Sequence, residues 1–102
     1  GEENISVYRA KLANGAESPA ERRFCADCGS GLWVWDPNRP ELLHPHASAI
    51  DTDLPRAPEA AHIMLGSKAG WTAVQAEPGD KQFNEYPDES IAAWHQRLGL
   101  EC

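Results

Sequence analysis

Two cysteines separated by two residues, Cys25 and Cys28, are the most chemically informative feature of the sequence, and Gly29 follows them. Thiolates at this spacing can both reach one tetrahedral Zn²⁺ at about 2.3 Å. Gly29 permits a backbone conformation that directs amide N–H groups toward the sulfurs. We therefore interpret Cys25 and Cys28 as half of a structural zinc site, which uses four ligands as a rule.

Two other interpretations of this Cys-x-x-Cys segment remain open. A dithiol redox centre usually has its cysteines at a helix N-terminus, which lowers the pKa of the first thiol. Here the segment leads into Leu32–Trp35, a run of apolar residues typical of a strand, so that helix is not expected. The third interpretation is a pair of surface cysteines with no ligand, which the spacing and the following glycine disfavour.

The remaining candidate zinc ligands are four histidines and the last residue: His44, His46, His62, His95 and Cys102. On a strand, His44 and His46 would share one face, but the proline between them disturbs a strand. We expect His62 to be a hydrogen-bonded or site-lining residue and His95 to be a partly buried helix residue. The other half of the zinc site is therefore expected from another chain or from a segment that precedes this one.

The charge of the chain argues against several classes of partner. Sixteen acidic and nine basic residues give a net charge of −7. Because phosphate groups are bound by clustered positive charge, we expect no nucleic-acid partner. No apolar run is long enough to span a bilayer, so no membrane association is expected either. Three cysteines, two of them in Cys-x-x-Cys, fit a reducing compartment, and we expect a cytoplasmic protein.

Short alternating or β-branched runs predict a chain that is mainly β. A turn rich in proline and asparagine is expected at residues 36–40. The tryptophans Trp33, Trp35 and Trp94 are expected to pack in the core. The predicted strands are residues 5–9, 32–35, 42–50, 62–65 and 71–74.

One helix is predicted near the C-terminus. Asp88 or Ser90 can cap its start, and Gly99 can adopt the left-handed conformation that follows its end. The residues at helical spacing form one stripe, which is apolar apart from its histidine: Ile91, Trp94, His95 and Leu98.

Taken together and in order, these segments resemble the glutathione-dependent formaldehyde-activating enzyme family, which also includes the centromere protein V domain. The resemblance covers nearly the whole chain and corresponds to the C-terminal portion of the family domain. The segments that carry it are Phe24-Cys25-Ala-Asp-Cys28-Gly29-Ser30, His62-Ile63, Lys68-Ala-Gly-Trp71 and the tail from Tyr86-Pro87 to Trp94.

The resemblance implies a β-tent (Mss4-like) fold of zinc-bearing antiparallel sheets with a C-terminal helix, here as a single domain over residues 1–102. It also implies Zn as cofactor, with Cys25 and Cys28 as two of four structural ligands. The other two ligands of the family come from an N-terminal Cys-x-Cys, and three further N-terminal cysteines hold a catalytic zinc. The family reaction is that of a carbon–sulfur lyase in reverse, joining formaldehyde and glutathione into S-hydroxymethylglutathione.

The sequence departs from the family pattern because no cysteine precedes Cys25. We therefore predict no catalytic residue in this chain and leave open whether it belongs to an enzyme. The chain begins with Gly1 and its only methionine is Met64, so we expect the C-terminal part of a longer domain. The alternative function is a non-catalytic, zinc-stabilised binding module, with zinc shared between the two chains of a homodimer through Cys25 and Cys28.

Overall fold

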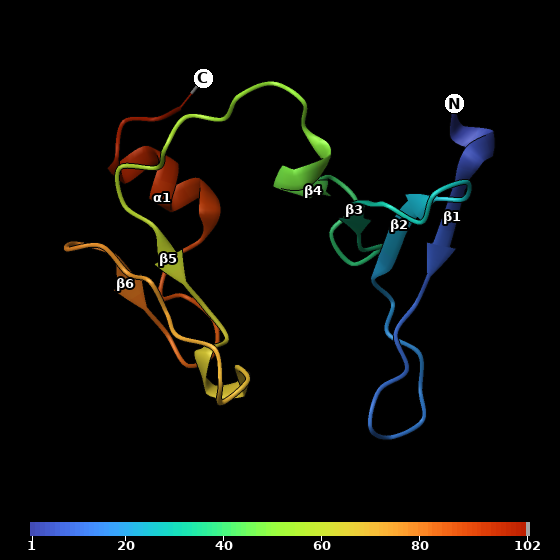
Figure 1. The fold of residues 1–102 in the computed structure, drawn as a ribbon, viewed down its shortest axis with the longest axis horizontal. Coiled ribbons are helices and arrows are strands. Elements are labelled where there is room, and N and C mark those ends of the chain that lie inside the picture. The colour runs from blue at the N-terminus through green and yellow to red at the C-terminus, as the bar shows by residue number, and fades with distance from the viewer. Residues whose placement is uncertain (102) are drawn as a thin grey trace. The chain divides into compact units, whose positions relative to one another are not determined.

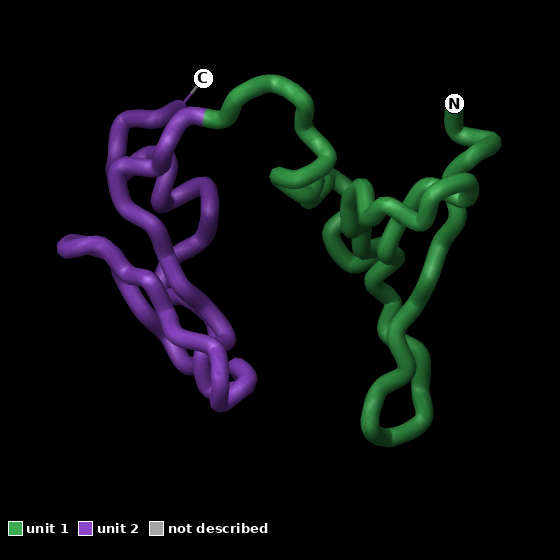
Figure 2. Tube along the Cα trace, viewed as in Figure 1, with its two compact units in different colours: residues 1–54 green, residues 55–102 purple. Residues whose placement is uncertain are grey.

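The computed structural model describes residues 1–101, so Cys102 lies outside the described residues. The chain divides into two compact units, Gly1–Leu54 and Pro55–Cys102, which are described separately below (Figure 2). The single domain expected over residues 1–102 stays a prediction.

The first unit is built on a four-stranded antiparallel sheet in which each strand pairs with the next along the chain (Figure 1). The strands are β1 (Ile5–Tyr8), β2 (Glu21–Cys25), β3 (Gly31–Trp35) and β4 (His44–Pro45), and a short 3₁₀ helix, η1 (Glu2–Asn4), precedes them. The strands predicted at 5–9 and 32–35 are therefore confirmed, with the first ending at Tyr8.

The register of the sheet places both tryptophans of β3 on one face. Trp35 lies opposite Glu21 and Trp33 opposite Arg23, and a bulge follows Arg23. Since alternate residues of a strand point to the same side, Trp33 and Trp35 share a face. Both are half-buried.

A buried carboxylate ties this sheet to the segment after β1. Glu21 is only 7% exposed. Its side chain accepts hydrogen bonds from Arg23 and from Arg9, the latter at 2.7 Å. The Arg23 guanidinium, and after it Arg9, lowers the pKa of Glu21 against the opposing effect of burial. The buried Glu21 carboxylate is therefore compensated by two guanidinium groups.

The strand predicted at residues 42–50 is wrong for most of its length. Only His44 and Pro45 form β4, and a 3₁₀ helix, η2 (Ala47–Ala49), follows. Proline has no N–H to donate to a ladder, which limits the strand. The last bond to β3 comes from His46, whose N–H donates to the Leu32 carbonyl at 2.9 Å.

The second unit combines a short parallel pair of strands with the only α-helix among residues 1–101. The pair is β5 (Ala61–His62) with β6 (Lys81–Gln82), and the helix is α1 (Ile91–Arg97). A mainly β chain with an antiparallel sheet and a C-terminal helix is therefore confirmed. The β-tent arrangement and its zinc stay predictions.

Two further strand predictions are wrong. The strand expected at 62–65 ends at His62, because Met64 has a left-handed φ of 58° and starts a 3₁₀ helix, η3 (Leu65–Ser67). Residues 71–74 form no strand; the Thr72 N–H instead bonds to the Ala69 carbonyl in a turn. Trp71 is 89% exposed in that turn.

The ends of α1 were predicted correctly. The Ser90 hydroxyl accepts the N–H of Ala93 at 3.0 Å. After the helix, Gly99 has a φ of +67°. The Leu100 N–H bonds to the His95 carbonyl at 2.8 Å, which closes the helix with a Schellman motif.

The described part of the chain has no fully buried hydrophobic side chain. Trp94, like the tryptophans of β3, is half-buried, so the expected packing of these residues is only partial. None of the helices within residues 1–101 combines the length and the apolar character that crossing a bilayer needs.

Candidate metal centre and the pocket of the second unit

The Cys-x-x-Cys turn connects β2 to β3. The Gly29 N–H donates to the Cys25 carbonyl at 2.8 Å, and the Cys25 N–H donates to the Ser30 carbonyl at 2.9 Å. Gly29 has a φ of +77°, a conformation that residues with a Cβ seldom adopt. The turn is also tied to the chain before β1, because the Ala26 N–H donates to Asn4 at 2.7 Å. The local backbone is therefore held at both ends of the turn.

Both thiols of this turn are free. Cys25, the last residue of β2, is half-buried, and Cys28 is exposed. The Cys28 Sγ lies 3.2 Å from the Ser30 Oγ, within hydrogen-bond distance for sulfur. No bond joins the two sulfurs, so both remain available as metal ligands.

The surroundings of Cys28 favour its thiolate. The Ser30 hydroxyl, then the Ser30 backbone N–H and the Cys25 thiol, lower the pKa of Cys28 through hydrogen bonds. Burial and the nearby Asp27 carboxylate oppose this effect. Zinc binds the thiolate form of cysteine, and hydrogen bonds from a second layer of donors stabilise that form. The donor set of the turn thus fits two of the four positions around a structural zinc.

The two histidines around β4 do not complete the site. His44 lies opposite Val34 in the sheet, and the His46 ring lies against Gly31, 3.3 Å from where a Cβ would be on that glycine. Among residues 1–101, no group of three or more His, Cys, Asp or Glu side chains is placed to hold a metal. The structure therefore brings together Cys25 and Cys28 alone.

The other two histidines take structural positions in the second unit, as expected. The His62 Nε2 lies 3.2 Å from the Asp80 carboxylate. His95 is half-buried, contacts Trp94 edge to face at 4.9 Å between ring centroids, and bonds through Nδ1 to the Ile91 carbonyl. Within residues 1–101, neither histidine lies in a group of side chains that could hold a metal.

Asp80 joins two distant parts of the second unit. It accepts the backbone N–H groups of Ala60 and Glu77, each at 3.0 Å, in addition to its contact with His62. These backbone bonds first, and then His62, lower the pKa of Asp80 to about 2. Because Ala60 precedes β5 and Asp80 precedes β6, this carboxylate fixes the start of the parallel pair.

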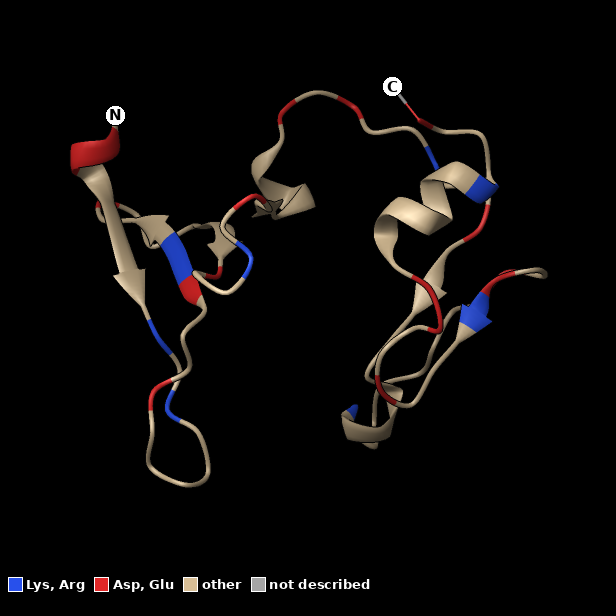
Figure 3. Ribbon diagram, turned by 180° about the vertical axis from the view of Figure 1, so that it is seen from behind, with Lys and Arg blue, Asp and Glu red and all other residues tan. Residues whose placement is uncertain are grey.

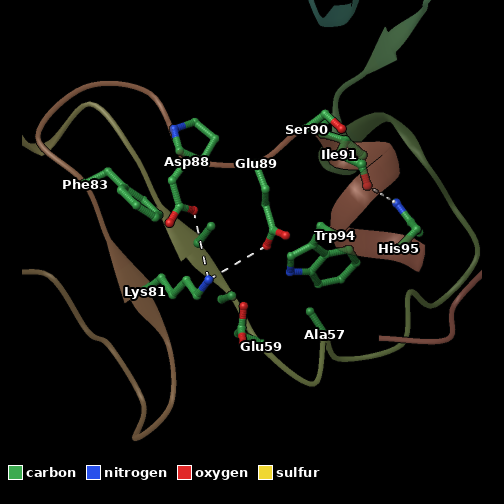
Figure 4. A pocket seen from close by; sticks show the side chains of 13 residues that line it. Ala57, Glu59, Lys81, Phe83, Asp88, Glu89, Ser90, Ile91, Trp94 and His95 are labelled. Carbon is green, nitrogen blue, oxygen red and sulfur yellow. Dashed lines mark hydrogen bonds and ion pairs between the residues drawn. The ribbon is translucent and has the colours of Figure 1, made fainter. Parts of the chain in front are cut away.

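The sequence did not predict a pocket in the second unit, with a volume of about 240 Å³, beside α1 (Figure 4). Lys81 reaches into its rim, with its Nζ 4.0 Å from Asp88 and 3.9 Å from Glu89. Arg97 bonds to both Glu59 and Glu89. The apolar stripe predicted on α1 includes Ile91 and Trp94, which line the pocket. No local sequence pattern predicted β6, whose Lys81 lines another side of the pocket.

The charges of the described residues follow the composition. Acidic residues occur in both units, and the Lys and Arg residues do not form one continuous cluster in either unit (Figure 3). Arg97 forms ion pairs with Glu59 and Glu89, and it lowers the pKa values of both. The absence of a nucleic-acid partner stays a prediction.

Comparison with known proteins gives one clear relative. The chain is 55% identical over 101 residues to a Halomonas elongata protein named "Putative glutathione-dependent formaldehyde-activating enzyme", a match that covers 99% of this chain. The chain spans 64% of the length of that relative. No family model matches the chain, and no solved structure matches it significantly.

The likeness to the centromere protein V domain is not tested by this match and stays a prediction. The larger resemblance, drawn from the Cys-x-x-Cys segment and the motifs that follow it, is confirmed. Over the residues that the two proteins share, this match supports membership of the glutathione-dependent formaldehyde-activating enzyme family.

Proposed function

We propose that Cys25 and Cys28 supply two thiolate ligands to a structural zinc in a protein that acts on glutathione and formaldehyde. The observation that carries the zinc proposal is the Cys-x-x-Cys turn itself. Two free thiols lie in one hairpin, and Ser30 and Cys25 lower the pKa of Cys28. A bound zinc would crosslink this turn to whatever supplies the other ligands, since structural sites are four-coordinate.

The name of the Halomonas elongata relative supports the substrates. In the proposed reaction, the sulfur of glutathione adds to the carbonyl carbon of formaldehyde. A C–S bond forms, the carbonyl oxygen takes up the proton that the thiol releases, and S-hydroxymethylglutathione results. The reverse reaction is the carbon–sulfur lyase step. We assign no catalytic role to a residue of this chain; the chain contributes fold and zinc ligands.

A second function is favoured by the exposure of Cys28. Two chains can each offer Cys25 and Cys28 to one shared zinc, which would make a zinc-bridged homodimer that serves as a non-catalytic binding module. Four thiolates from two chains complete the tetrahedral site. For either function, free thiols favour a reducing compartment, and we propose the cytoplasm.

Zinc content and molecular mass distinguish the two functions. We would purify the chain in a Cys102→Ser background, so that only two cysteines remain, and measure zinc per chain together with mass by light scattering. A zinc-bridged dimer predicts about 0.5 zinc per chain, because four ligands surround one ion. A half-site that needs further ligands predicts a monomer that holds zinc weakly.

Two variants connect these measurements to the turn. Cys28→Ser should weaken zinc binding and abolish any dimer. Asp27→Asn changes the same turn but keeps both thiols, so zinc binding should persist. Equal zinc affinity of the parent and Cys28→Ser chains, measured by titration with added zinc, would refute the assignment of the ligands.

The substrates need a separate test on the native protein. Magnetisation exchange in ¹H NMR reports the rate at which formaldehyde and glutathione interconvert with their adduct. The proposal predicts faster exchange with protein than without it. An unchanged rate with a fully zinc-loaded protein would remove the glutathione function and leave the zinc proposal standing.

A further inference from the structure

The pocket of the second unit is walled mostly by carbon. Trp94 and Ile91 of α1 form one side, and Phe83, which follows β6, lies on another (Figure 4). Short side chains before β5, among them Ala57 and Ala60, leave the space open. A volume of about 240 Å³ exceeds the roughly 150 Å³ that holds a benzene molecule, so a large side chain fits.

Residues 55–101 leave the apolar wall of this pocket uncovered. Ile91, on the apolar stripe of α1, is 64% exposed, and Trp94 is only half-buried. None of the hydrophobic side chains of residues 55–101 is fully buried. Burial of apolar surface is the main force that stabilises a folded domain, so an uncovered wall of this kind indicates an occupant.

Each carboxylate named at the rim has a cationic partner. Arg97 bonds to Glu59 at 2.6 Å and to Glu89 at 2.5 Å. Lys81 stands between Glu89 and Asp88, as the dashed lines of Figure 4 show. Because these carboxylates already have cationic partners, the rim offers no strong unpaired charge to a charged ligand. The chemistry of the pocket therefore selects an apolar group.

The relative contains a segment that could supply that group. This chain spans 64% of the Halomonas elongata protein, so 36% of the relative, by subtraction from 100%, has no counterpart in residues 1–102. We propose that the pocket receives a large apolar side chain from the polypeptide segment that corresponds to this 36%. The proposal does not depend on zinc or on the glutathione reaction.

The test is complementation of the chain by that segment. The 102-residue chain would be titrated, in calorimetry, with a synthetic polypeptide that corresponds to the unmatched part of the Halomonas elongata relative. We expect saturable one-to-one binding. Hydrogen exchange at the amides of α1 should slow in the complex, because the covered pocket stabilises the helix.

Substitutions locate the binding to the pocket. Trp94→Ala should weaken binding about 10-fold or more, as for a central apolar contact. Ile91→Ala, a smaller change, should weaken it less, which keeps the test valid if Trp94→Ala unfolds the helix. Trp71→Ala is the matched control, since Trp71 is 89% exposed on a turn outside the pocket and its loss should leave affinity unchanged.

Three results would overturn the proposal. The first is absence of binding by the polypeptide. The second is binding that Trp94→Ala and Ile91→Ala leave unchanged. The third is slow hydrogen exchange in α1 without any polypeptide, together with a molecular mass that rises with the concentration of the chain. A second copy of the chain would then be the occupant. In a Cys28→Ser background, Trp94→Ala should still weaken binding of the polypeptide. This result separates the inference from the zinc proposal.

Discussion

Asp80 offers a quantitative test of the second unit, because its three partners and its pKa are defined together. The Ala60 and Glu77 amides and the His62 ring surround its carboxylate at 3.0, 3.0 and 3.2 Å. A pKa of about 2 in place of 3.8 makes Asp80 a roughly 60-fold stronger acid than an ordinary aspartic acid.

Replacing His62 with alanine should raise the pKa of Asp80 only in part. The two backbone N–H donors are the largest causes of the lowered value and remain in the variant, so the pKa should stay below 3.8. NMR titration of the Asp80 carboxyl carbon in both proteins measures this directly. An Asp80 that titrates near 3.8 in the parent chain would refute the geometry around it.

The same carboxylate predicts how unfolding depends on pH. Because the folded pKa lies below the ordinary 3.8, Asp80 contributes stability that is present above about pH 4. That contribution is lost as the pH falls toward 2. Urea unfolding between pH 2 and 4 should show a larger loss of stability in the parent than in Asp80→Asn, which lacks this titrating group and keeps Glu21, Glu59 and Glu89. Parallel pH profiles for the two proteins would contradict the reasoning.

Three further changes test other local contacts. Ser90→Ala removes the cap of α1 and should cost about 1 kcal/mol in urea unfolding, whereas Ser90→Gly should cost a few tenths. Gly99→Ala forces a Cβ into left-handed backbone and should cost about 1–2 kcal/mol; an unchanged midpoint would contradict the Schellman end of the helix. Ser30→Ala should raise the pKa of Cys28, so that alkylation of the metal-free chain by iodoacetamide, followed by mass spectrometry, needs a higher pH.

Features set by neighbouring residues could be predicted from the sequence. The cap at Ser90 and the left-handed Gly99 depend on contacts a few residues away, and both appear where expected. The hairpin that carries Cys25 and Cys28 also depends on local factors, a glycine and two flanking strands. Ser30, which lowers the pKa of Cys28, immediately follows that glycine and could have been found by considering which donors face a turn thiol.

Features set by distant residues could not be predicted. The strand β6 (Lys81–Gln82) is only two residues long and exists through pairing with β5, about 20 residues earlier in the sequence. The apolar run 71–74 was expected to form a strand, but Trp71 lies in an exposed turn with no pairing strand. A periodic pattern shows which residues prefer burial, and only the partner segment determines whether they are buried.

The central claim, that Cys25 and Cys28 bind zinc as thiolates, is tested most directly by zinc-edge X-ray absorption on the native protein. Zinc–sulfur bonds at about 2.3 Å are the predicted result, with fewer sulfur neighbours in Cys28→Ser. A spectrum of oxygen and nitrogen neighbours alone, identical in the parent and in Cys28→Ser, would contradict the assignment.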